Sequence, residues 1–378
     1  MNNPFRLTFE GLERVIMSLQ QKGYDLIGPR YSDGVIVYDR IHSIDDLPSG
    51  FVDELTAGMC RLTKSGSRQF FGYALPPQSC KRFLYSPCRE LFTLRKDGKS
   101  FGLNTKEDRS PAYAFVGVRA CELSTISIQD RVFSSGDYRD EGYLSARKRN
   151  FIIAVNCSHA GETCFCTSMG TGPKAEAGFD VVLTEIMNGD SHYFVAETGS
   201  DAGASLMEGI GAGRADDSDV DAANETIRKV SDTVTKSMDI SDLPKLLADN
   251  TDHPQWDDVA KRCLTCGNCT LVCPTCFCST VEDTTDLTGR IAVRTRTWDS
   301  CFTMDFAKVS GGNFRISAKS RYRQWLTHKL SSWVEQFGVS GCVGCGRCIT
   351  WCPVGIDLTA EVAAIKGGVT KQESGGSR

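Results

Sequence analysis

The chain has 378 residues, with 43 basic and 47 acidic side chains and a formal net charge of −4. This length predicts two or three domains with a sizeable core, and the near-balanced charge excludes a broad nucleic-acid-binding surface. No apolar run is long enough for a transmembrane helix, and the N-terminus lacks the pattern of a secretory signal peptide. Eighteen cysteines without an export signal indicate a reducing compartment, where dense cysteine means metal rather than disulfides. We therefore expect a cytoplasmic metalloprotein without a membrane span.

The N-terminal part, residues 1–197, is expected to form a mixed α/β domain. Apolar residues at helical spacing predict an amphipathic helix over residues 7–22, with Thr8 as its N-cap and Gly23 at its end. A second helix is expected over residues 123–132. Six short runs have the composition of β-strands: residues 35–38, 70–75, 112–118, 151–155, 179–183 and 192–196.

Residues 198–253 are expected to connect this domain to the next one. The stretch 198–220 is rich in Gly, Ala, Ser and Asp, which predicts an exposed loop. A pair of helices is expected after it, over residues 221–239 and 241–249.

Two nearly identical cysteine motifs organise residues 254–366. Residues 263–274 and 342–353 both read C-x2-C-x2-C-x3-C-P, the run found in bacterial two-cluster ferredoxins. In that run three cysteines wrap one cluster and the fourth ligates the other. We therefore predict two [4Fe–4S] clusters with crossed fourth ligands. The predicted ligands are Cys263, Cys266, Cys269 and Cys352 for the first cluster, and Cys342, Cys345, Cys348 and Cys273 for the second.

A zinc ribbon or a set of disulfides is the alternative interpretation of these motifs. A ribbon uses two separated C-x2-C pairs, whereas each motif here has a third cysteine at the same spacing and ends in C-P, which favours clusters. The insert between the motifs, residues 274–341, is longer than in a minimal ferredoxin and is expected to contain a helix near 320–337. Residues 367–378 are expected to be a disordered tail. The predicted fold class is α+β: the mixed α/β domain, then a ferredoxin-like, mainly helical domain with a long insert.

Four cysteines outside the motifs are candidates for a third cluster. Cys121 and Cys157 each follow a predicted apolar strand, and strand ends are rigid places from which to present ligands. If the two strands are neighbours, four thiolates converge. The candidate ligands are Cys121, Cys157, Cys164 and Cys166. Buried free thiols or a structural zinc site are the alternatives.

Six further cysteines remain. Cys276, Cys278 and Cys301 are candidates for a further ligand or a further metal site, because the first two lie in a Thr-Cys-Phe-Cys segment that also occurs at 163–166. Cys60, Cys80 and Cys88 have no ligand-like spacing and are interpreted as free thiols.

Several segments together resemble one family. The chain resembles the beta (iron–sulfur) subunit of cytoplasmic sulfhydrogenase-type [NiFe]-hydrogenases and the A subunit of anaerobic sulfite reductase. One departure is Glu122, where this family leads us to expect Asp. The segments that carry the resemblance are 75–77, 81–84, 87–92, 117–122, 156–166, 253–257, 273–278, 298–301, 311–315 and 342–348.

The resemblance implies an electron-transfer subunit that does no bond chemistry itself. Such a subunit relays electrons between a diaphorase-type subunit that binds FAD and NAD(P) and the small and large subunits of the [NiFe]-hydrogenase. The chain itself shows no Rossmann motif, no P-loop and no nucleophile–base set, which agrees with this role. The same role in an anaerobic sulfite reductase or another multi-subunit oxidoreductase is the alternative. A zinc-bound structural scaffold is an alternative of another class.

Overall fold

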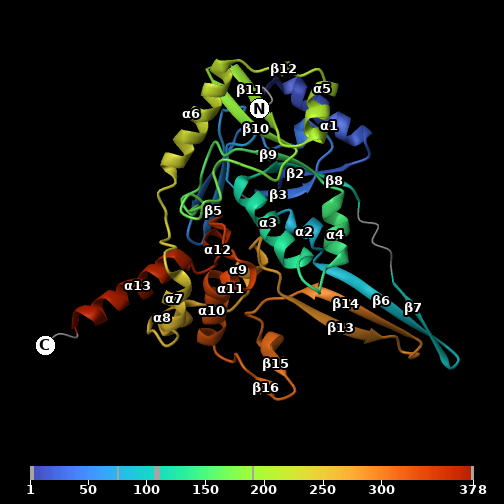
Figure 1. Cartoon of the computed structure of the whole chain (residues 1–378), viewed down its shortest axis with the longest axis vertical. Coiled ribbons are helices and arrows are strands. Elements are labelled where there is room, and N and C mark those ends of the chain that lie inside the picture. Colours follow the sequence, from blue (N-terminus) through green and yellow to red (C-terminus); the bar gives the residue numbers. More distant parts are fainter. Residues whose placement is uncertain (1–3, 75, 106–110, 190, 376–378) are drawn as a thin grey trace.

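The computed structural model describes residues 4–74, 76–105, 111–189 and 191–375 (Figure 1). Within these ranges no helix is both long and apolar enough to cross a bilayer. The chain is a mixed α/β structure, as predicted, whereas its division at the predicted domain boundaries remains a prediction.

An eight-stranded sheet forms the upper half of the molecule as drawn in Figure 1. Its strand order is β12-β1-β11-β10-β9-β8-β2-β3, and β10, β9, β8 and β2 run parallel to one another. In β9, alternate side chains face opposite sides of the sheet. The strands are β1 (Phe5–Leu7), β2 (Asp25–Ser32), β3 (Val35–Arg40), β8 (Tyr113–Val118), β9 (Phe151–Val155), β10 (Val181–Asn188), β11 (Ser191–Thr198) and β12 (Gly213–Arg214).

Helices cover both faces of this sheet. α1 (Phe9–Gln21) and α5 (Asp201–Gly209) pack on one face, and α3 (Ala120–Ser134) and α4 (Glu141–Lys148) pack on the other. The predicted caps of α1 are confirmed: the backbone N–H of Gly11 donates to Thr8 Oγ1 over 3.3 Å, and Gly23 follows the helix with φ of +84°. The remaining elements near the sheet are η1 (Ile44–Asp46), α2 (Lys81–Leu84) and α6 (Asp217–Thr233).

A four-stranded sheet of order β13-β14-β6-β7 projects away from the rest of the molecule (Figure 1). It joins two strands from the insert between the cysteine motifs to two strands from the N-terminal part of the chain. Its strands are β6 (Cys88–Asp97), β7 (Ser100–Asn104), β13 (Ser279–Thr285) and β14 (Ile291–Trp298). Two small hairpins complete the strands: β4 (Phe51–Thr56) with β5 (Met59–Lys64), and β15 (Lys308–Val309) with β16 (Gly312–Asn313).

The part of the chain with the two cysteine motifs is mainly helical. Its core is built from large apolar side chains, among them Trp256, Trp325, Leu326 and Ile349. The predicted helix near 320–337 is found as two helices joined by a π-helical turn. The elements are α7 (Leu243–Asp249), α8 (Gln255–Arg262), α9 (Asn268–Leu271), η2 (Met304–Ala307), α10 (Ala318–Thr327), the π turn η3 (His328–Ser332), α11 (Trp333–Phe337), α12 (Arg347–Thr350) and α13 (Leu358–Gly375).

The prediction of a loop over residues 198–220 is wrong, because this segment forms α5, β12 and the start of α6. Ser200 caps α5 by accepting from the N–H of Gly203, and Leu206 and Met207 are buried in the core under the sheet. A Cβ at Gly203 would collide with the carbonyl oxygen of Asp180. The small residues of this segment let α5 pack closely against its neighbours, and they are not the sign of a flexible loop.

The prediction of a strand over residues 70–75 is also wrong for residues 70–74, which form no strand. Leu75 lies outside the described residues. Side chains satisfy this backbone in place of a neighbouring strand. The N–H groups of Phe70 and Phe71 donate to the carboxylate of Glu185 over 2.7 and 2.9 Å. The Arg119 guanidinium donates to the carbonyls of Phe71 and Tyr73, each over 2.9 Å. Of the predicted tail, residues 376–378 lie outside the described residues, and α13 includes residues 367–375.

Candidate metal centres

The four cysteines predicted for the first cluster line one cavity. Three come from the first motif and the fourth comes from the second, and aromatic side chains form part of the wall. Cys348 of the second set reaches the same cavity. The cysteines are Cys263, Cys266, Cys269 and Cys352, and the aromatic residues are Phe302, Tyr322 and Trp325.

The four cysteines predicted for the second cluster line another cavity. Again three come from one motif and the fourth from the other, so the two cavities have the crossed arrangement that the sequence predicts. Its lining includes Cys342, Cys345, Cys348 and Cys273, with Phe165 and Lys329.

Glycines let the motif loops turn tightly against neighbouring backbone. Gly267, Gly344 and Gly346 have φ of +75°, +65° and +75°, in the left-handed region that favours glycine. A Cβ at Gly346 would lie 2.5 Å from the carbonyl oxygen of Thr163. The N–H of Phe165 donates to the carbonyl of Gly344 over 2.9 Å. The second motif therefore packs directly on the segment that contains Cys164 and Cys166.

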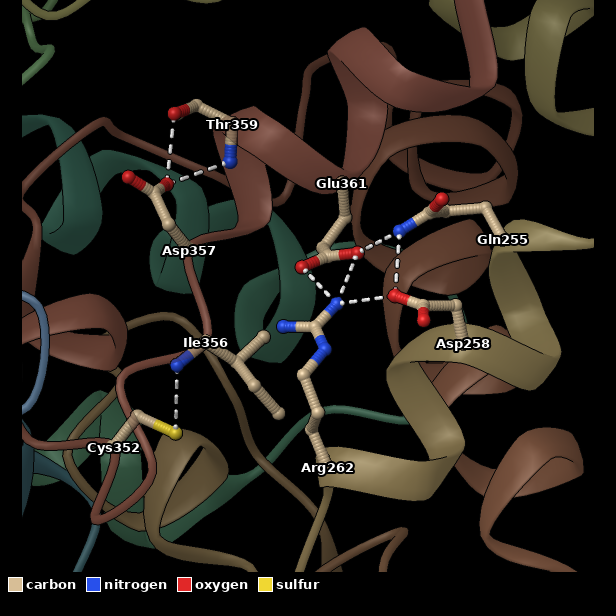
Figure 2. Close-up of polar contacts among 8 residues, drawn as sticks. All are labelled: Gln255, Asp258, Arg262, Cys352, Ile356, Asp357, Thr359 and Glu361. Atoms are coloured by element: carbon tan, nitrogen blue, oxygen red, sulfur yellow. Dashed lines mark hydrogen bonds and ion pairs between the residues drawn. The ribbon is translucent and has the colours of Figure 1, made fainter. Parts of the chain in front are cut away.

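A polar clamp holds the ends of the two motifs together (Figure 2). Arg262, immediately before Cys263, is ion-paired with Glu361 of α13 at 2.8 Å, and Gln255 donates to the same carboxylate over 2.6 Å. The N–H of Ile356 donates to Cys352 Sγ over 3.3 Å, as Figure 2 shows. The clamp brings the chain after the second motif back to the first motif, which explains how Cys352 reaches the first cavity.

Lys329 is a buried side chain beside the second candidate site that sequence reasoning missed. It is 2% exposed and its ammonium group donates to Cys273 Sγ over 3.2 Å, to Thr275 Oγ1 over 3.1 Å and to the carbonyl of Gly341 over 3.0 Å. Burial opposes the charge, but the nearby Cys273 and Cys276 thiolates raise the pKa of Lys329 well above its ordinary value. Contact with Cys276, and then the charge of Lys329, lowers the pKa of Cys273 well below its ordinary value. No local pattern marks Lys329, because it lies 56 residues from Cys273.

Most other motif thiols are shifted in the opposite direction. Burial raises the pKa of Cys263, Cys269, Cys345 and Cys348 above the ordinary value, and it raises that of Cys342 to about 12. Metal ligation requires the thiolate. These sites therefore favour a positively charged group that replaces the thiol protons, which is the chemistry an iron–sulfur cluster brings.

The four cysteines proposed for a third cluster lie close together. Their two strands, β8 and β9, are parallel neighbours, as the hypothesis requires. Cys121 and Cys166 are buried in one cluster with partly buried Cys345. Burial first, and then the charges of Cys157 and other nearby thiols, raises the pKa of Cys166 to about 12. Burial first, and then the charges of Cys166 and Cys157, raises the pKa of Cys164 as well.

Cys276, Cys278 and Cys301 line a third cavity, in which Lys329 also lies. Of the remaining cysteines, Cys80 is buried, whereas Cys60 and Cys88 are exposed. Within the described ranges, no group of three or more Cys, His, Asp or Glu side chains is arranged to hold a single metal ion.

A buried ion pair joins the second motif to the sheet. Arg347 lies between Cys345 and Cys348, and its guanidinium is 2.9 Å from Glu122 at the start of α3. It also donates to the carbonyl of Pro76 over 2.7 Å and to that of Gln78 over 3.1 Å. Glu122 thus accepts a hydrogen bond from Arg347 of the motif itself, and Cys121 beside it lies in the apolar cluster against which Cys345 packs.

Comparison with known proteins agrees with this geometry. Residues 262–356 match the family model of the 4Fe-4S dicluster domain, which supports two [4Fe–4S] clusters in this part of the chain. The chain is 29% identical over 351 residues to sulfhydrogenase 2 subunit beta of Pyrococcus furiosus, covering 90% of this chain and 92% of that relative. The resemblance to the sulfhydrogenase beta subunit is therefore confirmed. No solved structure matches the chain.

Proposed function

We propose that this chain is the iron–sulfur electron-transfer subunit of a [NiFe]-hydrogenase. In this proposal it relays electrons between a FAD- and NAD(P)-binding subunit and the small and large catalytic subunits. The observation that carries the relay role is the crossed pair of four-cysteine cavities. The name of the sulfhydrogenase relative favours a hydrogenase as the complex.

The eight motif cysteines are the proposed ligands of the two clusters. A [4Fe–4S] cluster, when bound, takes up and releases one electron at a potential set by its surroundings. The chain contributes the surroundings. Phe302, Tyr322 and Trp325 give the first cavity an aromatic wall, and Lys329 places a buried positive charge beside the second. This difference predicts different potentials for the two clusters.

The third cluster on Cys121, Cys157, Cys164 and Cys166 is part of the proposal. Two features support it: the neighbouring strands that deliver Cys121 and Cys157, and the contact of Gly344 in the second motif with the segment 163–166. A cluster there lies next to Cys345 and extends the relay toward the sheet.

Removing one ligand of the first cluster tests the relay. In the assembled complex, Cys269→Ala should abolish NAD(P)H-driven hydrogen production, while hydrogen oxidation with artificial dyes that enter at the catalytic subunit continues. Cys60→Ala, at an exposed cysteine outside every candidate site, is the matched control. Unchanged physiological turnover in Cys269→Ala would show that the relay role is wrong.

Copurification tests the partners. A tagged full-length chain isolated without air should recover a nickel-containing large subunit. Recovery of a sirohaem protein in its place would instead support the sulfite reductase alternative.

A variant at the proposed third cluster tests that assignment separately. Cys164→Ala should lose about four iron and four sulfide per chain relative to wild type, and Cys60→Ala should lose none. Equal iron content in all three proteins would remove the third cluster from the proposal.

A further inference from the structure

Three cysteines outside the ferredoxin-type motifs surround a cavity of their own. Cys276, Cys278 and Cys301 line a cavity of about 360 Å³, compared with about 30 and 20 Å³ at the first and second motif cavities. No other cysteine is among its described lining residues, but Arg315, Gln324 and His328 are. The cavity is therefore larger than the motif cavities, and polar side chains line it together with the thiols.

The backbone holds these three cysteines together from two distant segments. Cys276 and Cys278 lie just before β13, and Cys301 lies just after β14, which pairs with β13. The N–H of Asp299 donates to the carbonyl of Cys278 over 2.9 Å, which ties the two segments at the base of the hairpin. Phe277, between the two cysteines, packs against Phe133 and Phe337. This packing anchors the segment between α3 and α11.

Two buried lysines lie beside the thiols. Lys81 and Lys329 are 4% and 2% exposed, and Lys81 Nζ donates to the carbonyls of Cys273 and Cys276 over 2.8 and 3.1 Å. Within the described part of the chain, neither lysine is ion-paired with a carboxylate. A buried ammonium group requires negative charge nearby. The Cys273 sulfur of the second motif, 3.2 Å from Lys329 Nζ, supplies negative charge on one side. Metal-ligating thiolates of Cys276, Cys278 and Cys301 would add negative charge on the other, which neutral thiols would not.

The chemistry of the ligands and the width of the cavity favour a cluster over a single ion. A single zinc ion holds its thiolate ligands at about 2.3 Å, and no three such side chains within the described ranges are arranged to hold one ion. This cavity is larger than either motif cavity proposed to hold a [4Fe–4S] cluster, so it has room for a cluster of several irons. Thiolates are also the usual ligands of iron–sulfur clusters.

We propose that Cys276, Cys278 and Cys301 hold an additional iron–sulfur cluster with one iron that has no cysteine ligand and faces the cavity. Arg315 and Lys329 line the same cavity, so the ligand that this iron takes is a small anion. Cys276 lies three residues after Cys273 of the second motif. The centre is thus next to the second motif cavity, where electrons reach an iron that is open to a ligand.

The test uses the full chain, purified without air, as wild type, as the triple variant Cys276→Ala/Cys278→Ala/Cys301→Ala, and as the control Cys60→Ala. The triple variant should lose about four iron and four sulfide relative to wild type, and the control should lose none. Cyanide is the probe for the open iron. It should change the electron paramagnetic resonance spectrum of reduced wild type and of the control, and it should not change that of the triple variant.

Three results would overturn the inference: unchanged iron in a triple variant that retains the motif-cluster signals, loss of zinc in place of iron, or no response of wild type to cyanide. If the triple variant does not fold, Cys301→Ser carries the test, because its hydroxyl replaces one sulfur ligand. It should keep the iron with a shifted spectrum, and an unshifted spectrum overturns the inference. The inference rests on the proposed function. Iron-free wild type would overturn that function, whereas iron that the triple variant retains would overturn this inference alone.

Discussion

At the scale of single residues, charge and hydrogen bonding around the cysteine sulfurs distinguish the two motif cavities. Lys329 contacts a sulfur of the second set only, while backbone N–H groups contact sulfurs in both sets. Among these, the N–H of Ile356 donates to Cys352 and that of Gly344 donates to Cys342. Hydrogen bonds to the sulfurs and net charge are the means by which a protein tunes a cluster. The two clusters are thus expected to differ in redox potential.

Replacing Lys329 tests this difference. Lys329→Met removes a positive charge that stabilises the more negative, reduced cluster, so the potential of the second cluster should fall by roughly 50–100 mV, since 59 mV corresponds to a tenfold change for one electron. Redox titration followed by electron paramagnetic resonance measures it. The control is Lys319→Met, an ion-paired lysine at the surface. A fall of the same size in the control would show that local charge is not the cause.

Proton release on cluster assembly is a second residue-scale prediction. Because burial raises the pKa of Cys263, Cys269, Cys345 and Cys348, the metal-free protein keeps these thiols protonated to higher pH. Ligation removes the protons, so cluster incorporation should strengthen as pH rises from about 6.5 to 8.5 and weaken as it falls. The iron bound after reconstitution at each pH measures this. Incorporation that does not change with pH would contradict the burial argument.

At the scale of elements, close packing explains what the sequence pattern did not reveal. Thr8 and Gly23 marked the ends of α1 because caps are local signals. α5 was missed because its small residues resemble those of a loop, and their purpose is contact with the distant Asp180. β13 was missed because it has a polar, exposed sequence without apolar alternation. Its pairing with β14, and that of β14 with β6, places it in a sheet.

The packing of α5 gives an element-scale prediction. Gly203→Ala should lower the free energy of unfolding by about 1–3 kcal/mol, because the new methyl group overpacks the contact with Asp180. Chemical denaturation without air measures it. Gly209→Ala, at the end of the same helix with no atom within 4 Å of the added Cβ, should be nearly neutral. Equal effects of the two substitutions would mean that α5 does not pack as described.

The polar clamp between α8 and α13 gives a second element-scale prediction. Glu361→Gln removes the charge that holds Arg262, and it should destabilise the first cluster by about 1 kcal/mol, a small value because the Arg262 side chain is 41% exposed. The first cluster should then be lost faster than the second on exposure to a chelator, as followed by its spectroscopic signal. Glu225→Gln, in an exposed ion pair on α6, is the control. Equal loss rates for both clusters in Glu361→Gln would exclude the clamp as the support of the first site.

At the scale of the whole molecule, the second motif is built into the sheet domain. The Arg347–Glu122 ion pair and the contact of Phe165 with Gly344 join segments that are more than a hundred residues apart. The crossed lining of the two motif cavities could be predicted because the spacing of the thiols encodes it, and the ligand role of each cysteine stays a prediction. The roles of Arg347, Lys81 and Lys329 could not, because a lone basic residue carries no spacing signal and its partners are brought together only by folding.

The iron and acid-labile sulfide content of the full chain, purified under strict exclusion of air, tests the central claim most directly. The account predicts at least about eight iron and eight sulfide per chain. It also predicts that Cys352→Ala removes the same spectroscopic signal as Cys263→Ala, because the two cysteines share the first cavity. A colourless protein without iron, or one with zinc and no sulfide, would contradict it.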